Sequence, residues 1–158
     1  MTAKPKFDRI DKRILVALQA DGRLTNQALS ERVALSPSAC LARVRRLEKA
    51  GVIQGYHGRL DPFALNVGLI LFAEVTLNGH RPDQLSQFED TIKAIPEIVE
   101  ASHVTGAYDY LLKVVTADME AWTKIAESLT GANIGVDRIN THVLMDKPKI
   151  FLGYPLAD

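Results

Sequence analysis

Apolar residues recur at helical spacing three times within the first fifty positions of the chain. The first stripe predicts an amphipathic helix over Asp8–Asp21. Asp8 and Asp11 lie near its N-terminus, where their negative charges interact favourably with the positive end of the helix dipole. Gly22 follows and is expected to close this helix in the left-handed conformation. The apolar positions of the first stripe are Ile10, Ile14, Leu15 and Leu18.

Two further helices are predicted directly after the first. Thr25 can cap the second helix, while Ser36 can cap the third, with Pro37 at its first position and Gly51 at its end. A short turn at Ala34-Leu35 separates them, which is the arrangement of a helix-turn-helix. The inner faces carry Ala28, Leu29 and Val33 in the second helix, and Cys40, Val44 and Leu47 in the third.

The pattern then changes from helical to extended. Val52–Leu60 contains β-branched and aromatic residues broken by glycines, which predicts a short strand or a small β-hairpin and makes the helix-turn-helix a winged one. Asp61-Pro62 marks a turn and the start of a linker. We therefore expect a DNA-binding domain over residues 1–60, a linker over 61–67 and a second domain over 68–158.

Strands and helices alternate in the second domain. Four apolar or alternating runs predict strands, and two runs at helical spacing predict the helices between them. The order is β-α-β-β-α-β, the ferredoxin-like arrangement of an α+β domain. The predicted segments are the strands Leu69–Leu77, Ile98–Thr105, Tyr108–Thr116 and Val136–Met145, and the helices Pro82–Ile95 and Asp118–Gly131.

Charge separates the two predicted domains. The 158 residues contain 19 Lys plus Arg and 19 Asp plus Glu, so the formal net charge is zero. Residues 1–60 nevertheless hold 12 basic and 5 acidic residues, and the remainder holds 7 basic and 14 acidic residues. Such asymmetry indicates two modules with different partners, the basic one facing a polyanion. One cysteine and the lack of a long apolar run predict a cytoplasmic protein without a membrane segment.

The third helix is the candidate DNA reader. Its small residues would let the helix enter a major groove, its first N–H groups and serine hydroxyls would hold phosphates, and its arginines would contact phosphates or guanine. An ordinary solvated helix face is the alternative interpretation. The residues predicted to contact double-stranded DNA are Ser36, Ser38, Ala39, Arg43, Arg45, Arg46 and Lys49, with Arg45 toward a flank.

These motifs, taken in order, resemble the Lrp/AsnC family of bacterial and archaeal regulators. The similarity runs from Asp8 to about Met145 and includes a segment that resembles the signature of the family's ligand-sensing domain. It implies a DNA-binding transcriptional regulator that responds to a small amino-acid effector. The motifs are Asp8–Leu15, Ser36–Cys40, Arg43–Glu48, Gly51–Tyr56 and Val104–Leu112.

The second domain is expected to self-associate. Both helices of a βαββαβ unit cover one sheet face, so the other face is left open with apolar residues that need a partner. We expect this face to carry Ile70, Phe72, Leu112 and Val114, or their neighbours. We therefore expect a homo-oligomer. The open sheet face predicts a dimer, and the family resemblance implies that such dimers assemble into tetramers or octamers.

The turn between the second and third strands is the candidate effector site. Gly106 permits close backbone approach and Asp109 could pair with an ammonium group, whereas an ordinary hairpin is the alternative. The resemblance implies amino-acid binding near this loop, between dimers, with the last strand of a neighbouring subunit. His142 departs from the family's usual tyrosine. The predicted effector residues are Thr105, Gly106, Ala107, Tyr108, Asp109, Thr141, His142 and Val143.

No convergent catalytic set is evident in the sequence. The other histidines show no metal-ligand spacing with one another or with Cys40, and no phosphate-binding loop or nucleophile elbow occurs. We therefore expect neither an enzyme nor a cofactor. Two alternatives stay open: an architectural nucleoid-type protein without an effector, and an enzyme assembled between two subunits of the ferredoxin-like domain.

Overall fold

The computed structural model divides the chain into two units. It describes residues 7–62, 64–65 and 67–156; the parts of the predicted domains and linker at residues 1–6, 63, 66 and 157–158 lie outside them. The first unit comprises the chain up to Leu60 together with the C-terminal segment from Lys149, and the second comprises Asp61–Pro148. The sequence had suggested that everything from residue 68 onward belongs to one domain, whereas the structure groups the last segment with the N-terminal helices.

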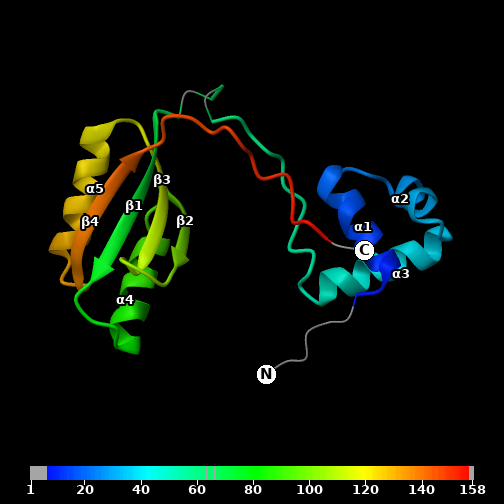
Figure 1. The fold of residues 1–158 in the computed structure, drawn as a ribbon, viewed down its shortest axis with the longest axis horizontal. Helices are drawn as coiled ribbons and strands as arrows, with labels where there is room; N and C mark the ends of the chain where they lie inside the picture. The colour runs from blue at the N-terminus through cyan, green and yellow to red at the C-terminus, as the bar shows by residue number, and fades with distance from the viewer. Residues whose placement is uncertain (1–6, 63, 66, 157–158) are drawn as a thin grey trace. The chain divides into compact units, whose positions relative to one another are not determined.

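The described residues of the first unit form three helices: α1 (Arg9–Ala20), α2 (Asn26–Val33) and α3 (Pro37–Lys49) (Figure 1). The predicted caps at Thr25 and Ser36 are confirmed, since each side chain accepts a hydrogen bond from a backbone N–H of the first turn. Gly51 follows α3 with a φ of 69°. The two N-terminal caps, Thr25 and Ser36, satisfy N–H groups that a helix cannot pair internally.

The predicted left-handed cap at Gly22 is wrong. Helix α1 ends at Ala20, the extended Asp21 after it still donates its N–H to the Ala17 carbonyl, and Gly22 has no positive φ. The Asp21 carboxylate accepts a hydrogen bond from the Arg23 N–H, so an aspartate turn takes the chain away from the helix.

The apolar stripes of the three helices meet in one small core. Its buried members are Ile14, Leu29, Val33, Cys40, Val44 and Leu47. Cys40 is completely buried, and this burial raises the pKa of its thiol. Cys40 therefore serves as a small packing residue, as its inner phase on α3 predicted.

The strand or hairpin predicted over Val52–Leu60 does not form. This stretch, here called the wing segment, contains no strand residue, although two half-buried side chains, Val52 and Ile53, pack against the core. Strand formation requires a hydrogen-bonding neighbour, and none of the described residues forms a ladder with the wing segment. The composition predicted a strand but could not supply its hydrogen-bonding partner.

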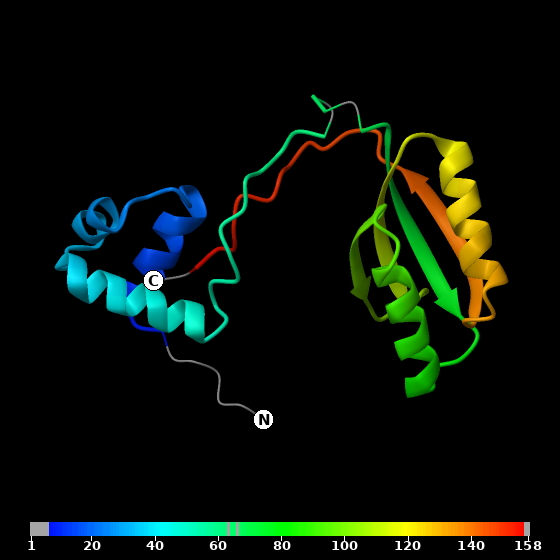
Figure 2. The ribbon, with the colours of Figure 1, turned by 180° about the vertical axis from the view of Figure 1, so that it is seen from behind.

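The second unit is the predicted α+β sandwich. A four-stranded antiparallel sheet has the order β2-β3-β1-β4, and two helices cover one of its faces (Figures 1 and 2). This confirms the βαββαβ order. The elements are β1 (Leu69–Leu77), α4 (Pro82–Lys93), β2 (Ile98–His103), β3 (Tyr110–Thr116), α5 (Met119–Gly131) and β4 (Val136–Val143).

The strand register decides which residues face the helices. Leu112 and Val114 are fully buried in the core with Phe88 of α4 and Trp122 of α5, so their predicted place on the open face is wrong. Their neighbours on β3 occupy that face instead. The open face holds Ile70, Phe72, Glu74 and Thr76 of β1, with Leu111, Lys113 and Val115 of β3.

Candidate DNA-binding surface and effector loop

Helix α3 presents three distinct faces. Cys40, Val44 and Leu47 point into the core, and a second stripe beside them turns toward the N-terminus of α1. The third stripe lies opposite the core at spacings of four, three and four residues, so it faces outward. This outward stripe consists of Ser38, Ala42, Arg45 and Lys49, all of which are exposed.

The stripe that faces α1 is occupied by ion pairs. Arg43 Nη1 lies 2.6 Å from Asp8 Oδ2 and 2.9 Å from Asp11 Oδ1. Arg46 Nη2 contacts the other carboxylate oxygen of Asp11. Only 1% of the Asp11 side chain is exposed, against 57% of Arg46. Asp11 is thus a buried carboxylate neutralised by two arginines of α3, as buried charges require.

The same two aspartates begin α1. The Asp8 carboxylate accepts a hydrogen bond from the Asp11 N–H, and the Asp11 carboxylate accepts one from the Asp8 N–H, which forms a reciprocal capping box. The Asp11 N–H is the main reason why the pKa of Asp8 is lowered, and Arg43 lowers it further. The pKa of Arg43 is raised in turn by its bonds to Asp8 and Asp11. One cluster therefore caps α1 and anchors α3.

Arg45 and Lys49 differ from these two arginines. Neither forms an ion pair with any of the described residues, and both lie on the outward stripe. The sequence interpretation had put Arg43 and Arg46 outward and Arg45 at a flank, and the packing of α3 on α1 reverses this assignment. Ser36 and Ser38 lie at the exposed start of α3, with 3.3 Å between their hydroxyl oxygens. Ala39 is also exposed there.

The wing segment contacts α3 through Tyr56. Its hydroxyl donates to Glu48 Oε1 across 3.0 Å. Partial burial and the adjacent Glu48 carboxylate raise the pKa of Tyr56. The sequence analysis did not identify this contact, because no spacing rule relates a loop residue to a helix side chain eight positions earlier.

The predicted effector loop, Thr105–Asp109, joins β2 to β3. Gly106 has a φ of 136°, and a Cβ built there would meet nothing within 4 Å, so the loop is open to solvent at this point. Asp109 is different because both of its carboxylate oxygens are engaged. Oδ2 accepts the Leu77 N–H at 2.7 Å, and Oδ1 lies 2.7 Å from His80 Nε2. Thr105 and Ala107 are exposed, and Tyr108 is half-buried.

These contacts explain the ionisation of Asp109. The Leu77 N–H is the largest cause of its lowered pKa, followed among the favourable contacts by His80. In this conformation the carboxylate fixes the end of β1 to the loop. Both oxygens of the Asp109 carboxylate thus already have one hydrogen-bond partner within the chain.

The predicted effector residues of β4 point to two faces of the sheet. Thr141 lies on the helix-facing side of β4, where it stays exposed while its hydroxyl accepts the Trp122 indole N–H at 2.9 Å. His142 pairs with Phe72 on the open face, and its Nε2 lies 3.3 Å from Glu74 Oε1. Val143 is partly exposed at the strand end. Because β4 and the loop flank opposite sides of β1, one chain does not bring them together.

A polar cluster that the sequence analysis missed lies beside the loop. The Tyr110 hydroxyl donates to Glu89 Oε1 across 2.9 Å, and the His103 ring stacks on the Tyr110 ring with centroids 4.5 Å apart. Burial, aided by the Glu89 charge, raises the pKa of Tyr110 to about 12. The described residues include no group of three or more His, Cys, Asp or Glu side chains arranged to hold a metal ion.

Comparison with known proteins assigns both units. A model described as winged helix-turn-helix DNA-binding matches residues 7–54, and one described as the Lrp/AsnC ligand binding domain matches residues 70–151. The chain belongs to the Lrp/AsnC family. It is a DNA-binding transcription regulator with a ligand-binding domain, as the sequence analysis predicted.

Close relatives and solved structures agree with this assignment. The chain is 46% identical over 143 residues to the leucine-responsive regulatory proteins of Klebsiella pneumoniae and Escherichia coli K12, covering 90% of this chain and 87% of theirs. A Neisseria meningitidis transcriptional regulator solved with L-Met has a TM-score of 0.85 at 35% identity, covering 95% of this chain and 97% of that one. An AsnC family regulator from Agrobacterium tumefaciens has a TM-score of 0.83 at 30% identity, covering 94% and 97%.

These relatives are regulators of transcription, which confirms the expectation that this family member is not an enzyme. No helix within residues 7–62, 64–65 and 67–156 is both long enough and apolar enough to span a bilayer.

Proposed function

We propose that this Lrp/AsnC family member reads its operator mainly through the outward stripe of α3. The observation that carries this proposal is the contrast between Arg43, held by two aspartates, and Arg45, which lies outward without an ion pair among the described residues. Ser38 and Ala42 are small enough to let the helix approach the base edges, and Arg45 and Lys49 supply positive charge. Ser36 and Ala39 stand at the exposed helix start, where the Ser38 N–H and the two serine hydroxyls can meet phosphate oxygens.

Arg43 and Arg46 have a different role in this proposal. Arg43 orients the helix by bonding α1, whereas Arg46 is more exposed and can share its guanidinium between Asp11 and a DNA phosphate. The proposed DNA-binding surface thus has two kinds of basic residue. Arg45 and Lys49 form no ion pair among the described residues, whereas Arg43 and Arg46 are paired with aspartates of α1. This arrangement supports both phosphate contact and a defined helix orientation.

The active assembly is proposed to be a dimer built on the open face of the sheet. Phe72, Leu111 and Val115 are half-buried on that face, whereas Ile70 is only 7% exposed, so a lone unit would leave part of these three apolar side chains in water. A two-fold dimer also supplies two recognition helices for a palindromic site. Further association into tetramers or octamers follows the family resemblance.

Replacing Phe72 by Glu tests this assembly. We expect size-exclusion chromatography with light scattering to show a shift toward monomer, because the charge would be buried without a partner. Ser128→Glu on the exposed side of α5 is the matched control and should leave the mass unchanged. An unchanged mass in Phe72→Glu would place the dimer interface elsewhere.

The effector is proposed to be a small α-amino acid bound at Thr105–Tyr108, with Thr141–Val143 of a neighbouring subunit beside it. The open backbone around Gly106 supports this site, because its N–H groups can meet a carboxylate. The relatives that are named as leucine-responsive or were solved with L-Met support the ligand class. Asp109 is proposed to position the loop rather than to bind the ammonium group directly.

Fluorescence anisotropy with the chain's own upstream promoter duplex tests the whole proposal. We expect salt-dependent binding that shifts when L-leucine, L-methionine or another apolar amino acid is added. Binding without a response to any amino acid in a full panel would indicate an architectural nucleoid-type protein instead. Action on DNA also implies a cytoplasmic location, which is part of this proposal.

A further inference from the structure

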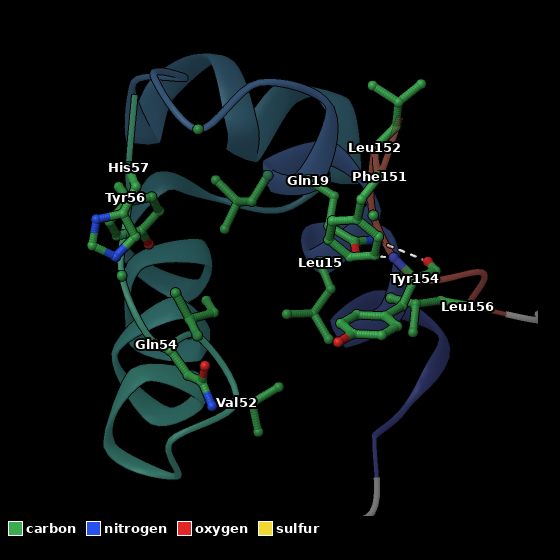
Figure 3. Close-up of a pocket in the computed structure, with 15 residues that line it drawn as sticks. Leu15, Gln19, Val52, Gln54, Tyr56, His57, Phe151, Leu152, Tyr154 and Leu156 are labelled. Carbon is green, nitrogen blue, oxygen red and sulfur yellow. Dashed lines mark hydrogen bonds between the residues drawn. The ribbon is translucent and has the colours of Figure 1, made fainter. Parts of the chain in front are cut away.

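The C-terminal segment of the chain packs on the DNA-binding helices. Residues 149–156, here called the strap, border a groove of about 590 Å³ between α1 and the wing segment (Figure 3). One wall is formed by Leu15 and Leu18 of α1, and the floor continues through Val52 and Ile53. The strap supplies the other wall through Phe151, Leu152, Tyr154 and Leu156. An apolar segment therefore forms one wall of an apolar groove within the same unit.

One glutamine fastens the strap to α1. Gln19 Nε2 donates to the Tyr154 carbonyl at 3.1 Å, and the Tyr154 N–H donates to Gln19 Oε1 at 2.6 Å (Figure 3). The side-chain amide thus satisfies both backbone groups of one residue, as a neighbouring strand would. Arg59, which follows the wing segment's aromatic part, donates to the Phe151 carbonyl at 3.3 Å. These bonds fix the register of the strap.

The backbone of the strap is adapted to this contact. Gly153 has a φ of 137°, a region that side-chain-bearing residues rarely adopt. A Cβ at this position would lie 2.7 Å from Gln19 Oε1 and 2.8 Å from Gln19 Cδ. Any other residue at position 153 would therefore be strained and would collide with the glutamine that holds the strap.

The strap is fastened but only shallowly buried. Leu152 and Tyr154 keep 72% of their surface exposed, and Phe151 keeps 65%. Phe151 and Tyr154 contact each other edge to face, with ring centroids 5.0 Å apart. Burial of this extent contributes little, so most of the hold comes from a few hydrogen bonds. Such a contact is suited to reversible docking.

The groove leads to the recognition helix. The wing segment that lines the groove also carries Tyr56, which bonds Glu48 on α3. The Tyr56 ring lies close to Gly22 after α1, since a Cβ on that glycine would be 3.6 Å from Tyr56 Cδ1. The wing segment therefore bonds the strap through Arg59 and α3 through Tyr56.

We propose that the docked strap is a clamp that holds the wing segment on α1 and thereby keeps α3 in its DNA-reading orientation. The strap follows β4 directly through residues 144–148, so its local concentration at the groove depends on where β4 is. A ligand or a partner copy that moves β4 beyond the reach of this short tether undocks the strap. This gives the sensing unit a second covalent route to the DNA-binding unit besides the 61–67 linker.

Hydrogen exchange on the full-length protein tests the clamp. Gly153→Ala and Gln19→Ala each remove the fastening, and we expect exchange of the Tyr154 N–H and the 52–57 amides to become roughly tenfold faster. Gly131→Ala and Gln87→Ala are matched controls, because a Cβ at Gly131 meets nothing within 4 Å and Gln87 is exposed on α4. Both controls should exchange as the wild type does.

DNA affinity supplies the second readout. The affinity of both strap variants for the promoter duplex should fall severalfold, while amino-acid binding measured by calorimetry stays at the wild-type value. Unchanged exchange in both strap variants would overturn the proposal, and faster exchange with unchanged DNA affinity would overturn its link to α3. Only the DNA-affinity measurement presupposes the proposed function; the hydrogen-exchange measurement does not. A wild-type protein that binds no DNA would refute the proposed function, whereas the exchange rates would still decide whether the strap holds the wing segment.

Discussion

Arg43 of α3 forms an ion pair with Asp8, the residue that caps α1, with 2.6 Å between Nη1 and Oδ2. The pair joins two helices that are 35 positions apart in the chain. It also removes one cation from the surface available to DNA, because the same guanidinium bonds Asp11. Basic residues on the recognition helix therefore divide into those that hold the helix and those that can contact a partner.

Replacing Arg45 by Ala should weaken DNA binding more than any other single arginine replacement on α3. We expect a loss of roughly tenfold or more, since a good arginine contact to a base contributes about 1–3 kcal/mol. Thermal stability should stay unchanged, because Arg45 is exposed. Anisotropy titrations over a range of salt concentrations measure both the affinity and the number of phosphate contacts. Lys93→Ala in α4 is the control, and equal affinities of the two variants would contradict the outward assignment.

Replacing Arg43 by Ala should mainly lower stability. The change leaves Asp11, which is almost completely buried, with one arginine instead of two. We expect the free energy of unfolding to fall by about 1–3 kcal/mol, the range for a charged hydrogen-bond partner lost from a buried group. Urea denaturation measures this. A double-mutant cycle with Asp8→Ala isolates the outer pair, and additive effects would show that Arg43 and Asp8 do not stabilise each other.

Asp109 should make the second unit sensitive to acid. Its pKa is lowered in the folded state, chiefly by the Leu77 N–H and also by His80, so the stability that it contributes is present above the ordinary carboxyl pKa. That contribution is lost as the pH falls below about 4. We expect Asp109→Asn to be less stable than the wild type at pH 7, by a difference that shrinks as the pH falls below the ordinary carboxyl pKa and through the lowered pKa of the folded state. A constant difference across this range would exclude the ionised carboxylate as the cause.

Tyr110 should lose its phenolic proton only at unusually high pH. Burial and the Glu89 charge raise its pKa to about 12, so the folded state retains the phenolic proton more tightly than the unfolded state. Its contribution to stability is therefore complete below about pH 10 and disappears as the pH rises through 12. Ultraviolet absorbance during alkaline titration should show one late transition that Tyr110→Phe removes. Persistence of that transition in the variant would assign it to another tyrosine.

Much of the architecture follows from the order of residues alone. Apolar positions at helical or alternating spacing predicted all three helices of the first unit and the βαββαβ order of the second, because burial of one face imposes that period. Serine and threonine at the caps of α2 and α3 were identified because short hydroxyl side chains reach the first free N–H groups. The unequal charges of the two halves pointed to DNA. These features are local or summed over the chain, so they need no knowledge of which segments meet.

Packing decided the rest, and each difference involves residues far apart in the chain. Arg43 is held against α1 only because folding brings it within ion-pair distance of Asp8 and Asp11. Leu112 lies under the helices because the register of β3 with β1 put it there, and a shift of one residue would have reversed every side chain. The strap has no periodicity that could reveal its site. Gln19 and Tyr154 are 135 positions apart, and only the folded chain brings that side chain and that backbone together.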